Sequence, residues 1–235
     1  MRILITDGMD KAAMAQLREL GHEVVEQFYE PDQLGAALRD FDAVVVRSKT
    51  KVRANHIDEA KGGKLKLIIR GGVGVDNIDV KYAEENGITV RNTPGASSQS
   101  VAELAMGHMF ACTRYISIAG HTMREGKWEK KAYGKGVELQ GKTLGIIGFG
   151  RIGQHLGVMA KAIGMNVVAY STTRRPEVEA GKVRAAGLDV YADEPTANAA
   201  LYSHPMVSCT PHIGAATVEA QKRIGTEIVD IIRSF

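Results

Sequence analysis

The stretch Lys142-Thr-Leu-Gly-Ile-Ile-Gly-Phe-Gly-Arg-Ile-Gly153 decides the fold of this chain. A short apolar run leads into glycines at positions 148, 150 and 153, and the residues that follow have apolar side chains at helical spacing. This strand–turn–helix order is the context that a dinucleotide-binding glycine fingerprint requires. The first glycine permits the tight turn, the second admits a pyrophosphate, and the third lets the helix pack closely on the strand. The pattern therefore favours NAD(P) binding over a glycine-rich turn without a ligand.

On both sides of the fingerprint, short apolar strands alternate with helical segments. Such alternation predicts an α/β fold with parallel sheets and helices on both faces. The expected helices are Lys11–Leu20, Pro31–Leu38, Ser98–Met123, Arg151–Ile163 and Thr217–Phe235. The expected strands are Arg2–Asp7, His22–Gln27, Ala43–Arg47, Leu65–Arg70, Ile88–Val90, Leu144–Ile147, Asn166–Tyr170, Ala186–Val190 and Met206–Thr210.

Composition limits the kinds of partner that the protein can have. The net charge is +3 without a long basic run, which predicts neither a nucleic-acid nor a membrane partner but suits a small anionic substrate. No apolar run approaches the roughly 20 residues that span a bilayer. The two cysteines, Cys112 and Cys209, lack metal-site spacing and are interpreted as buried thiols in a reducing cytoplasm. We expect no metal site.

Seven motifs in order along the chain resemble the D-isomer-specific 2-hydroxyacid dehydrogenases, most of all those members that oxidise 3-phosphoglycerate. One is the glycine fingerprint itself. The others are Val-Arg-Ser-Lys-Thr-Lys-Val (46–52), Arg-Gly-Gly-Val-Gly-Val-Asp-Asn-Ile-Asp (70–79), Asn-Thr-Pro (92–94), Gly-Lys-Trp-Glu (126–129), Leu-Asp-Val-Tyr-Ala-Asp-Glu-Pro (188–195) and Pro-His-Ile-Gly-Ala (211–215).

The resemblance implies two Rossmann-like lobes, one flavodoxin-like and one dinucleotide-binding. Residues 1–93 with 216–235 would form the substrate-binding lobe, to which the C-terminal helix returns. Residues 94–215 would form the NAD(P)-binding lobe, whose long helix would serve a homodimer interface. We also expect the short form of these enzymes, without an appended regulatory domain.

The resemblance also implies an acid/base pair. His212 matches the histidine that exchanges a proton with the substrate hydroxyl, and Glu194 matches the carboxylate that orients this imidazole. Both residues follow apolar strands, where a parallel sheet places its ligands. Asp193 is the rival to Glu194, and the residues alone leave that choice open. The other histidines are interpreted as structural: His22, His56, His108, His121, His155 and His204.

Further site residues are assigned by the same resemblance. The glycine-rich loop after residue 70 would hold the substrate carboxylate with its backbone N–H groups. Substrate-binding residues would be Arg47, Ser48, Gly72, Val73, Gly74 and Lys130, the last from this chain or from a partner subunit. Cofactor-binding residues would be Gly148, Gly150, Arg151, Ile152, Gly153, Ser171, Thr172, Asp189, Gly214, Ala215 and Val73, with Asp189 on the nicotinamide carboxamide.

The chain departs from the family pattern at the end of the strand after the fingerprint. NAD-specific members place an acidic residue there to hold the ribose hydroxyls. Here the position is Ser171, followed by Thr172 and, two residues later, by Arg174 and Arg175. Hydroxyl groups and arginines suit a 2′-phosphate, so we expect NADP(H) to be accepted or preferred.

A second departure is one of length. Ser171 and Asp189 are 18 positions apart, whereas the family places two further strand–helix units between these positions, each βαβ unit needing roughly 30 residues. The family's catalytic arginine, in an Asn-x-x-Arg-Gly segment, belongs to the part that is lacking. We therefore expect a segment to be missing near residues 173–179. An intact chain of this length would be a poor enzyme.

These observations lead to three functional hypotheses. The first is a cytoplasmic, homodimeric NAD(P)-dependent dehydrogenase that converts 3-phosphoglycerate to 3-phosphohydroxypyruvate in serine biosynthesis. The second is a hydroxypyruvate or glyoxylate reductase. The third is a non-catalytic, NAD(H)-sensing protein like the corepressors built on this fold, which the lacking arginine favours and the retained His212 and Glu194 disfavour.

Overall fold

The computed structural model describes residues 1–170, 186–199, 203–204 and 207–235. The chain divides into two compact units, residues 1–97 with 217–235 and residues 98–216. The boundary between the units was expected after residue 93 and lies after residue 97, four residues later. The return to the first unit was expected after residue 215 and lies after residue 216. No helix in the described ranges is long and apolar enough to cross a membrane.

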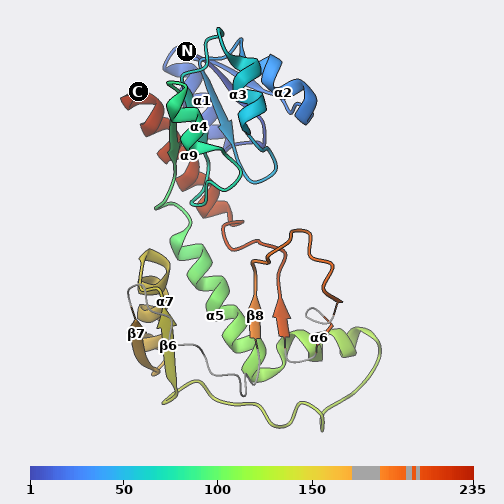
Figure 1. The fold of residues 1–235 in the computed structure, drawn as a ribbon. Helices are drawn as coiled ribbons and strands as arrows, with labels where there is room; N and C mark the ends of the chain where they lie inside the picture. The colour runs from blue at the N-terminus through green and yellow to red at the C-terminus, as the bar shows by residue number, and fades with distance from the viewer. Residues whose placement is uncertain (171–185, 200–202, 205–206) are drawn as a thin grey trace. The chain divides into compact units, whose positions relative to one another are not determined.

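The first unit is built on a five-stranded parallel sheet in the order β2-β1-β3-β4-β5 (Figure 1). This is the flavodoxin-like order, whose ligand crevice lies where β1 and β3 diverge. The predicted strand positions are confirmed, with ends that differ by one or two residues. The strands are β1 (Arg2–Ile5), β2 (Glu23–Glu26), β3 (Ala43–Val46), β4 (Leu67–Arg70) and β5 (Thr89–Asn92).

Helices cover both faces of this sheet, as predicted, because the strands are apolar on both sides. One buried cluster joins α2, α3 and α4 to Leu4, Val44 and Ile68. The other joins α1 and the C-terminal α9 to the alternate strand residues, which point to the opposite face of the sheet, such as Ile5 and Ile69. The short helices α3 and α4 were not predicted from the sequence. The helices are α1 (Lys11–Glu19), α2 (Pro31–Leu38), α3 (Ala54–Ala60), α4 (Val80–Glu85) and α9 (Val218–Ser234).

The second unit is assembled around α5, which contacts α7 as well as β8 and β9. Its strand β6 runs into the fingerprint turn and α7 follows, as the sequence predicts. The elements are α5 (Ser98–Arg114), α6 (Ile116–Arg124), β6 (Thr143–Ile147), α7 (Arg151–Ala162), β7 (Asn166–Tyr170), β8 (Ala186–Leu188) and β9 (Val207–Cys209).

The predicted single helix from Ser98 to Met123 is wrong, because α5 and α6 are separate. Tyr115 between them has φ 58°, the left-handed region that ends a helix. The carbonyl of Thr113, which a continuous helix would bond to residue 117, instead accepts the N–H of Val137 at 2.9 Å. The connection that returns toward β6 therefore takes the hydrogen bond that would have continued α5.

A continuous parallel sheet in the second unit was also expected and is not seen in the described residues. They form two separate parallel pairs, β6-β7 and β8-β9. In the doubly wound strand order 3-2-1-4-5-6, the fourth strand lies between the first and the fifth. Among the described residues no strand lies between β6 and β8, so the two pairs share no neighbour. The side chains of Ile147 and Val168 are 70% and 61% exposed, so one face of the β6-β7 pair is bare.

Candidate active site

The glycine turn has the geometry that a pyrophosphate needs. Gly148 has φ 93°, which permits the turn, and no atom lies within 4 Å of where a Cβ on Gly150 would be. A Cβ on Gly153 would meet the carbonyl oxygen of Gly148 at 2.5 Å, so close packing requires glycine there. The first turn of α7, which includes Arg151 and Ile152, presents backbone N–H groups beside this open space. These residues fit a dinucleotide.

His212 and Glu194 contact each other at the ends of β9 and β8. The His212 Nδ1 lies 2.7 Å from the Glu194 Oε2, while the N–H of Tyr191 donates to the other carboxylate oxygen at 3.1 Å. The hydrogen bond from His212 is the main reason why the pKa of Glu194 is lowered. An ionised carboxylate only accepts, so the imidazole carries its proton on Nδ1 and leaves Nε2 for a substrate. Glu194, not its rival Asp193, makes this contact.

Asp189 holds the segment on which His212 lies. Its Oδ1 accepts the N–H of Ile213 at 2.8 Å and its Oδ2 accepts the N–H of Gly214 at 2.9 Å. Burial raises the pKa of this carboxyl, but hydrogen bonds from Thr210 and these two amides outweigh it and lower the pKa overall. His212 itself has φ 53°, a backbone conformation that is uncommon outside glycine. Both carboxylate oxygens of Asp189 therefore already accept hydrogen bonds from this turn and hold it in place.

A cavity of about 480 Å³ lies against the histidine–glutamate pair. It falls in the size range of small-molecule pockets, so a small hydroxy acid would fit beside the imidazole. The described residues contain no cluster of His, Cys, Asp and Glu that could hold a metal ion. The lining residues are Tyr191, Glu194, Pro195, Thr196, Cys209, Thr210, Pro211 and His212.

In the first unit, two side chains fix the loop that follows β3. Asp7, just after β1, accepts the N–H groups of Arg47 and Thr50 at 2.7 and 2.9 Å. The Nδ2 of Asn77 donates to the carbonyls of the same two residues at 2.6 and 2.7 Å. Sequence reasoning did not single out Asp7 or Asn77. The loop backbone is held from both sides, and Arg47 and Ser48 stand at the crevice expected between β1 and β3.

Arg70 is a further cation at this edge that sequence reasoning missed. It ends β4 in register with Val46, so it lies beside Arg47. Burial, chiefly, and the neighbouring Arg47 lower the pKa of Arg70 and outweigh the nearby carboxylates of Asp76 and Asp7, which raise it; the arginine stays charged. No ion pair to Arg70 is formed by the described residues. The signal that could have found it is its position at the same strand end as Arg47.

The glycine-rich loop after β4 offers fewer free amides than expected. The N–H groups of Gly71 and Gly72 are donated to the carbonyls of Val46 and Arg70. Gly72 instead provides space, since a Cβ there would collide with the Arg70 guanidinium. The N–H groups of Val73 and Gly74 have no hydrogen-bond partner among the described residues. The candidate anion nest is therefore these two amides.

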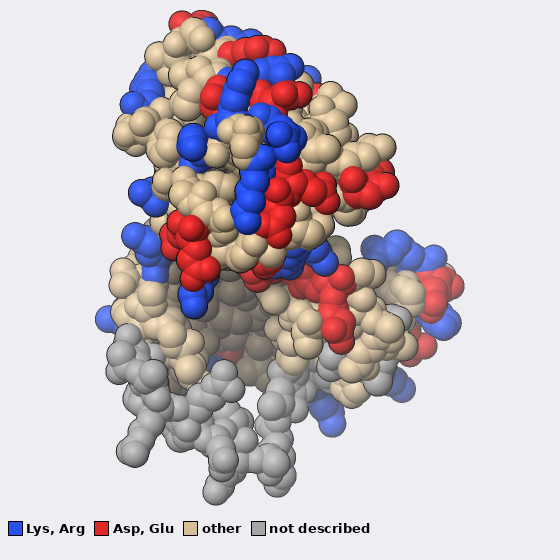
Figure 2. Space-filling view, turned by 45° about the horizontal axis from the view of Figure 1, so that its top comes forward, with Lys and Arg blue, Asp and Glu red and all other residues tan. Residues whose placement is uncertain are grey.

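The remaining predicted site residues are placed as follows. Lys130 is exposed on the connection between α6 and β6. Gly214 approaches Asp189 so closely that a Cβ would lie 2.9 Å from its Oδ2, and Ala215 follows it. Ser171, Thr172 and the gap predicted near residues 173–179 lie outside the described residues. Figure 2 shows positive and negative side chains next to one another over the face it displays.

Comparison with known proteins identifies relatives over almost the whole chain. The model of the D-isomer specific 2-hydroxyacid dehydrogenase catalytic domain matches residues 3–235. The chain is 40% identical to a hydroxypyruvate reductase of Thermotoga maritima, over 98% of this chain and 97% of the relative. It is 36% identical to a D-3-phosphoglycerate dehydrogenase of Methanocaldococcus jannaschii, over 99% of this chain but only 57% of that protein.

Solved structures agree with the fold. The TT0316 protein from Thermus thermophilus has a TM-score of 0.82 and 26% identity, covering 97% of this chain and 94% of its own. An NADPH-dependent glyoxylate/hydroxypyruvate reductase from Sinorhizobium meliloti, solved with NADP and malonate, has a TM-score of 0.79 and 23% identity over 99% of this chain and 92% of its own. At that identity the second likeness shows the fold alone.

The alignment with the Thermotoga protein also measures a difference in length. The alignment extends over 299 positions, whereas this chain has 235 residues. At least 64 positions of the alignment are therefore gaps in this chain. That length agrees with the absence of two strand–helix units, each of roughly 30 residues. It also agrees with the split between β6 and β8.

Proposed function

This chain belongs to the D-isomer-specific 2-hydroxyacid dehydrogenases, and from that premise we propose that it transfers a hydride between NAD(P) and a D-2-hydroxyacid. The observation that carries the proposal is the 2.7 Å contact between His212 and Glu194 beside a cavity, in the unit that also contains the glycine turn. General acid–base catalysis needs such an imidazole, positioned by a carboxylate and open on its second nitrogen.

The residues of this chain account for the proton transfer. In the oxidative direction the Nε2 of His212 accepts the hydroxyl proton, while the ionised Glu194 stabilises the imidazolium that results. In the reductive direction the imidazolium returns that proton to the carbonyl oxygen. The turn at Gly148, Gly150 and Gly153 would hold the pyrophosphate of NAD(P), which when bound supplies or accepts the hydride.

The substrate that we favour is 3-phosphoglycerate, as part of serine biosynthesis. Arg47 and Arg70 place two positive charges at neighbouring strand ends. The carboxylates of Asp76 and Asp7 act on Arg70 from a distance, but no described residue forms a direct ion pair with it. Two adjacent guanidinium groups suit a substrate with both a carboxylate and a phosphate. The amides of Val73 and Gly74 would bind the carboxylate.

Replacing Arg70 by methionine tests this assignment. Because a hydrogen bond to a charged group contributes about 1.5–3 kcal/mol, we expect KM for 3-phosphoglycerate to rise about 10- to 100-fold. Arg91→Met, which removes an exposed arginine from the neighbouring strand, is the matched control and should change KM less than twofold by the same steady-state assay. An equal KM for wild type and Arg70→Met would contradict the assignment.

A hydroxypyruvate or glyoxylate reductase is the second candidate. It is supported by the 40% identity to a hydroxypyruvate reductase of which this chain covers 97%, compared with 57% of the phosphoglycerate dehydrogenase. Measuring 3-phosphoglycerate oxidation against hydroxypyruvate and glyoxylate reduction in one preparation separates the two. A kcat/KM for either reductase substrate above that for the phosphorylated pair would favour the second candidate.

Cofactor preference is a separate proposal, that NADP(H) is accepted or preferred. It rests on the sequence, where Ser171 replaces the usual acidic residue and arginines follow. Introducing the acid, Ser171→Asp, should turn the preference toward NADH by about tenfold or more, because a carboxylate binds ribose hydroxyls and repels a 2′-phosphate. Comparing kcat/KM for NADH and NADPH in both proteins measures this. A tenfold NADH preference in the wild type would overturn the proposal.

We further propose a cytoplasmic homodimer. Large apolar side chains are exposed along α6 and the following connection, namely Ile116, Met123 and Trp128, with Trp128 78% exposed. Large apolar side chains exposed close together in the sequence are the support for an interface here. Both cysteines are free thiols, which suits a reducing compartment, but they are half-buried and not fully buried as expected.

A further inference from the structure

His108 of α5 is buried and hydrogen-bonded through both ring nitrogens. Its Nδ1 lies 2.8 Å from the hydroxyl of Ser208, and its Nε2 lies 3.0 Å from the hydroxyl of Thr210. The Thr210 hydroxyl in turn donates to the Asp189 Oδ1 at 2.6 Å. His108 is therefore two hydrogen bonds from the carboxylate that holds the amides beside His212, although no sequence pattern assigns it more than a structural role.

The donors and acceptors in this chain have only one consistent arrangement. Asp189 is an ionised carboxylate and only accepts hydrogen bonds, so the Thr210 hydroxyl donates its single proton to it. The Nε2 of His108 must then donate to Thr210. Burial lowers the pKa of His108, which keeps the ring neutral, so its Nδ1 accepts the proton of Ser208. Ser208 has no second proton, hence the hydroxyl of Ser117 on α6, 3.4 Å away, is the donor to it.

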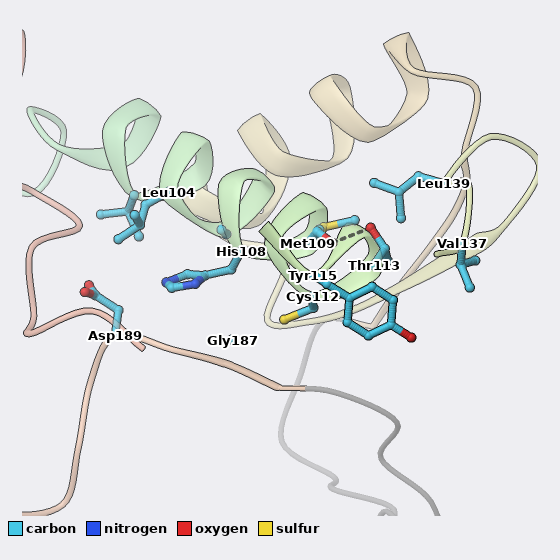
Figure 3. Close-up of a pocket in the computed structure, with 12 residues that line it drawn as sticks. Leu104, His108, Met109, Cys112, Thr113, Tyr115, Val137, Leu139, Gly187 and Asp189 are labelled. Carbon is cyan, nitrogen blue, oxygen red and sulfur yellow. Dashed lines mark hydrogen bonds between the residues drawn. The ribbon is translucent and has the colours of Figure 1, made fainter. Parts of the chain in front are cut away.

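Packing holds this ring in place. A Cβ on Gly187 of β8 would lie 2.6 Å from the Cβ of His108, so α5 can approach β8 this closely only at a glycine. Figure 3 shows the imidazole extending from α5 toward Asp189, across a cavity of about 500 Å³ lined mainly by apolar side chains. A polar group here has few alternatives to these two hydroxyl partners. Its orientation is therefore well determined.

We propose that His108, in its neutral Nε2–H form, is a positioning residue for the catalytic histidine. It orients Thr210, Thr210 orients the Asp189 carboxylate, and Asp189 holds the amides of Ile213 and Gly214, directly after His212 in the turn. Ser117 extends the same chain of hydrogen bonds into α6. The catalytic part of this inference rests on the proposed dehydrogenase function, whereas the hydrogen-bond chain does not.

Two substitutions interrupt the chain at different links. His108→Phe retains a ring of similar shape without hydrogen bonds, and Thr210→Val removes the linking hydroxyl but leaves His108 in place. His108→Gln, which keeps a donor and an acceptor, should restore part of the effect. His155→Phe, on the exposed surface of α7, is the control.

The primary measurement is nitrogen-15 NMR of the full chain. In the wild type we expect the neutral rings of His108 and His212 to carry their protons on Nε2 and Nδ1, respectively. In His108→Phe and Thr210→Val the His212 proton should move toward Nε2, and solvent exchange of the Ile213 and Gly214 amides should rise about tenfold. Turnover should show kcat reduced about tenfold with the cofactor KM within twofold.

These readouts separate the two layers of the proposal. Unchanged amide exchange and an unchanged His212 tautomer in both variants would overturn it. If His108→Phe fails to fold, Thr210→Val alone decides. NMR changes as expected in a protein that turns over no hydroxy acid would support the positioning chain and reject the dehydrogenase function.

Discussion

Replacing His212 by alanine is expected to reduce kcat for hydroxy-acid oxidation about 10²- to 10⁴-fold, the usual contribution of a positioned general base. Among the residues described as lining the cavity next to Glu194, no other side chain accepts a hydroxyl proton as readily near neutral pH. The affinity for NAD(P)H, measured by fluorescence titration, should change little, because the glycine turn is untouched. A loss confined to kcat would show that the imidazole acts on the reacting atoms.

The matched control is another histidine–carboxylate pair. The Nε2 of His121 on α6 lies 3.1 Å from the Oε1 of Glu125, the residue directly after this helix. Both side chains are exposed and line neither of the cavities described above. His121→Ala should leave kcat within twofold of wild type. Equal turnover in the wild type and His212→Ala would contradict the assignment.

The contact between His212 and Glu194 also predicts how the site responds to pH. The hydrogen bond from His212 lowers the pKa of Glu194 below the ordinary value of 4.5, so the carboxylate is protonated at a lower pH than a free glutamate. The contact with His212 is therefore present at neutral pH and is lost in acid as Glu194 becomes protonated.

The sequence predicted most of the fold because its strands are short apolar runs between turn residues. Ala43–Val46, and Leu67–Arg70 apart from its last residue, are apolar on both faces, which implies helices on both sides of a parallel sheet. The missed helices α3 and α4 have only seven and six residues, too few for a periodic pattern to be distinctive. The break at Tyr115 depends on a hydrogen bond from Val137, a tertiary contact that no local pattern encodes.

The site was predictable to the extent that it follows strand ends. His212 and Glu194 could be paired because both follow apolar strands and each lies in a motif of the same family. Arg70 and His108 were missed for a different reason, since each acts through a neighbour from another element. Arg47 lies next to Arg70 because β3 and β4 pair in this register. The partners of His108 lie 100 and 102 positions away in the sequence. Only the folded chain brings such residues together.

The largest gain in activity is expected from supplying what the chain lacks. Inserting the segment of the Thermotoga protein that faces the gap between about residues 173 and 179 should join β6 to β8 through a strand between them. It should also cover the exposed side chains of Ile147 and Val168. Because such a segment carries the family's catalytic arginine, we expect kcat/KM to rise about 10²- to 10³-fold, the effect of one donor aimed at developing charge.

A second chimera, with that arginine changed to methionine, separates chemistry from folding. Both chimeras should protect the β6 amides from hydrogen exchange, because the strand gains a second neighbour, but only the first should gain turnover. If both fold and bind NAD(P)H while neither turns over, His212 and Glu194 serve a nucleotide-sensing protein instead of an enzyme. If the first alone is active, the parent chain has retained its acid/base pair while lacking the charge that completes it.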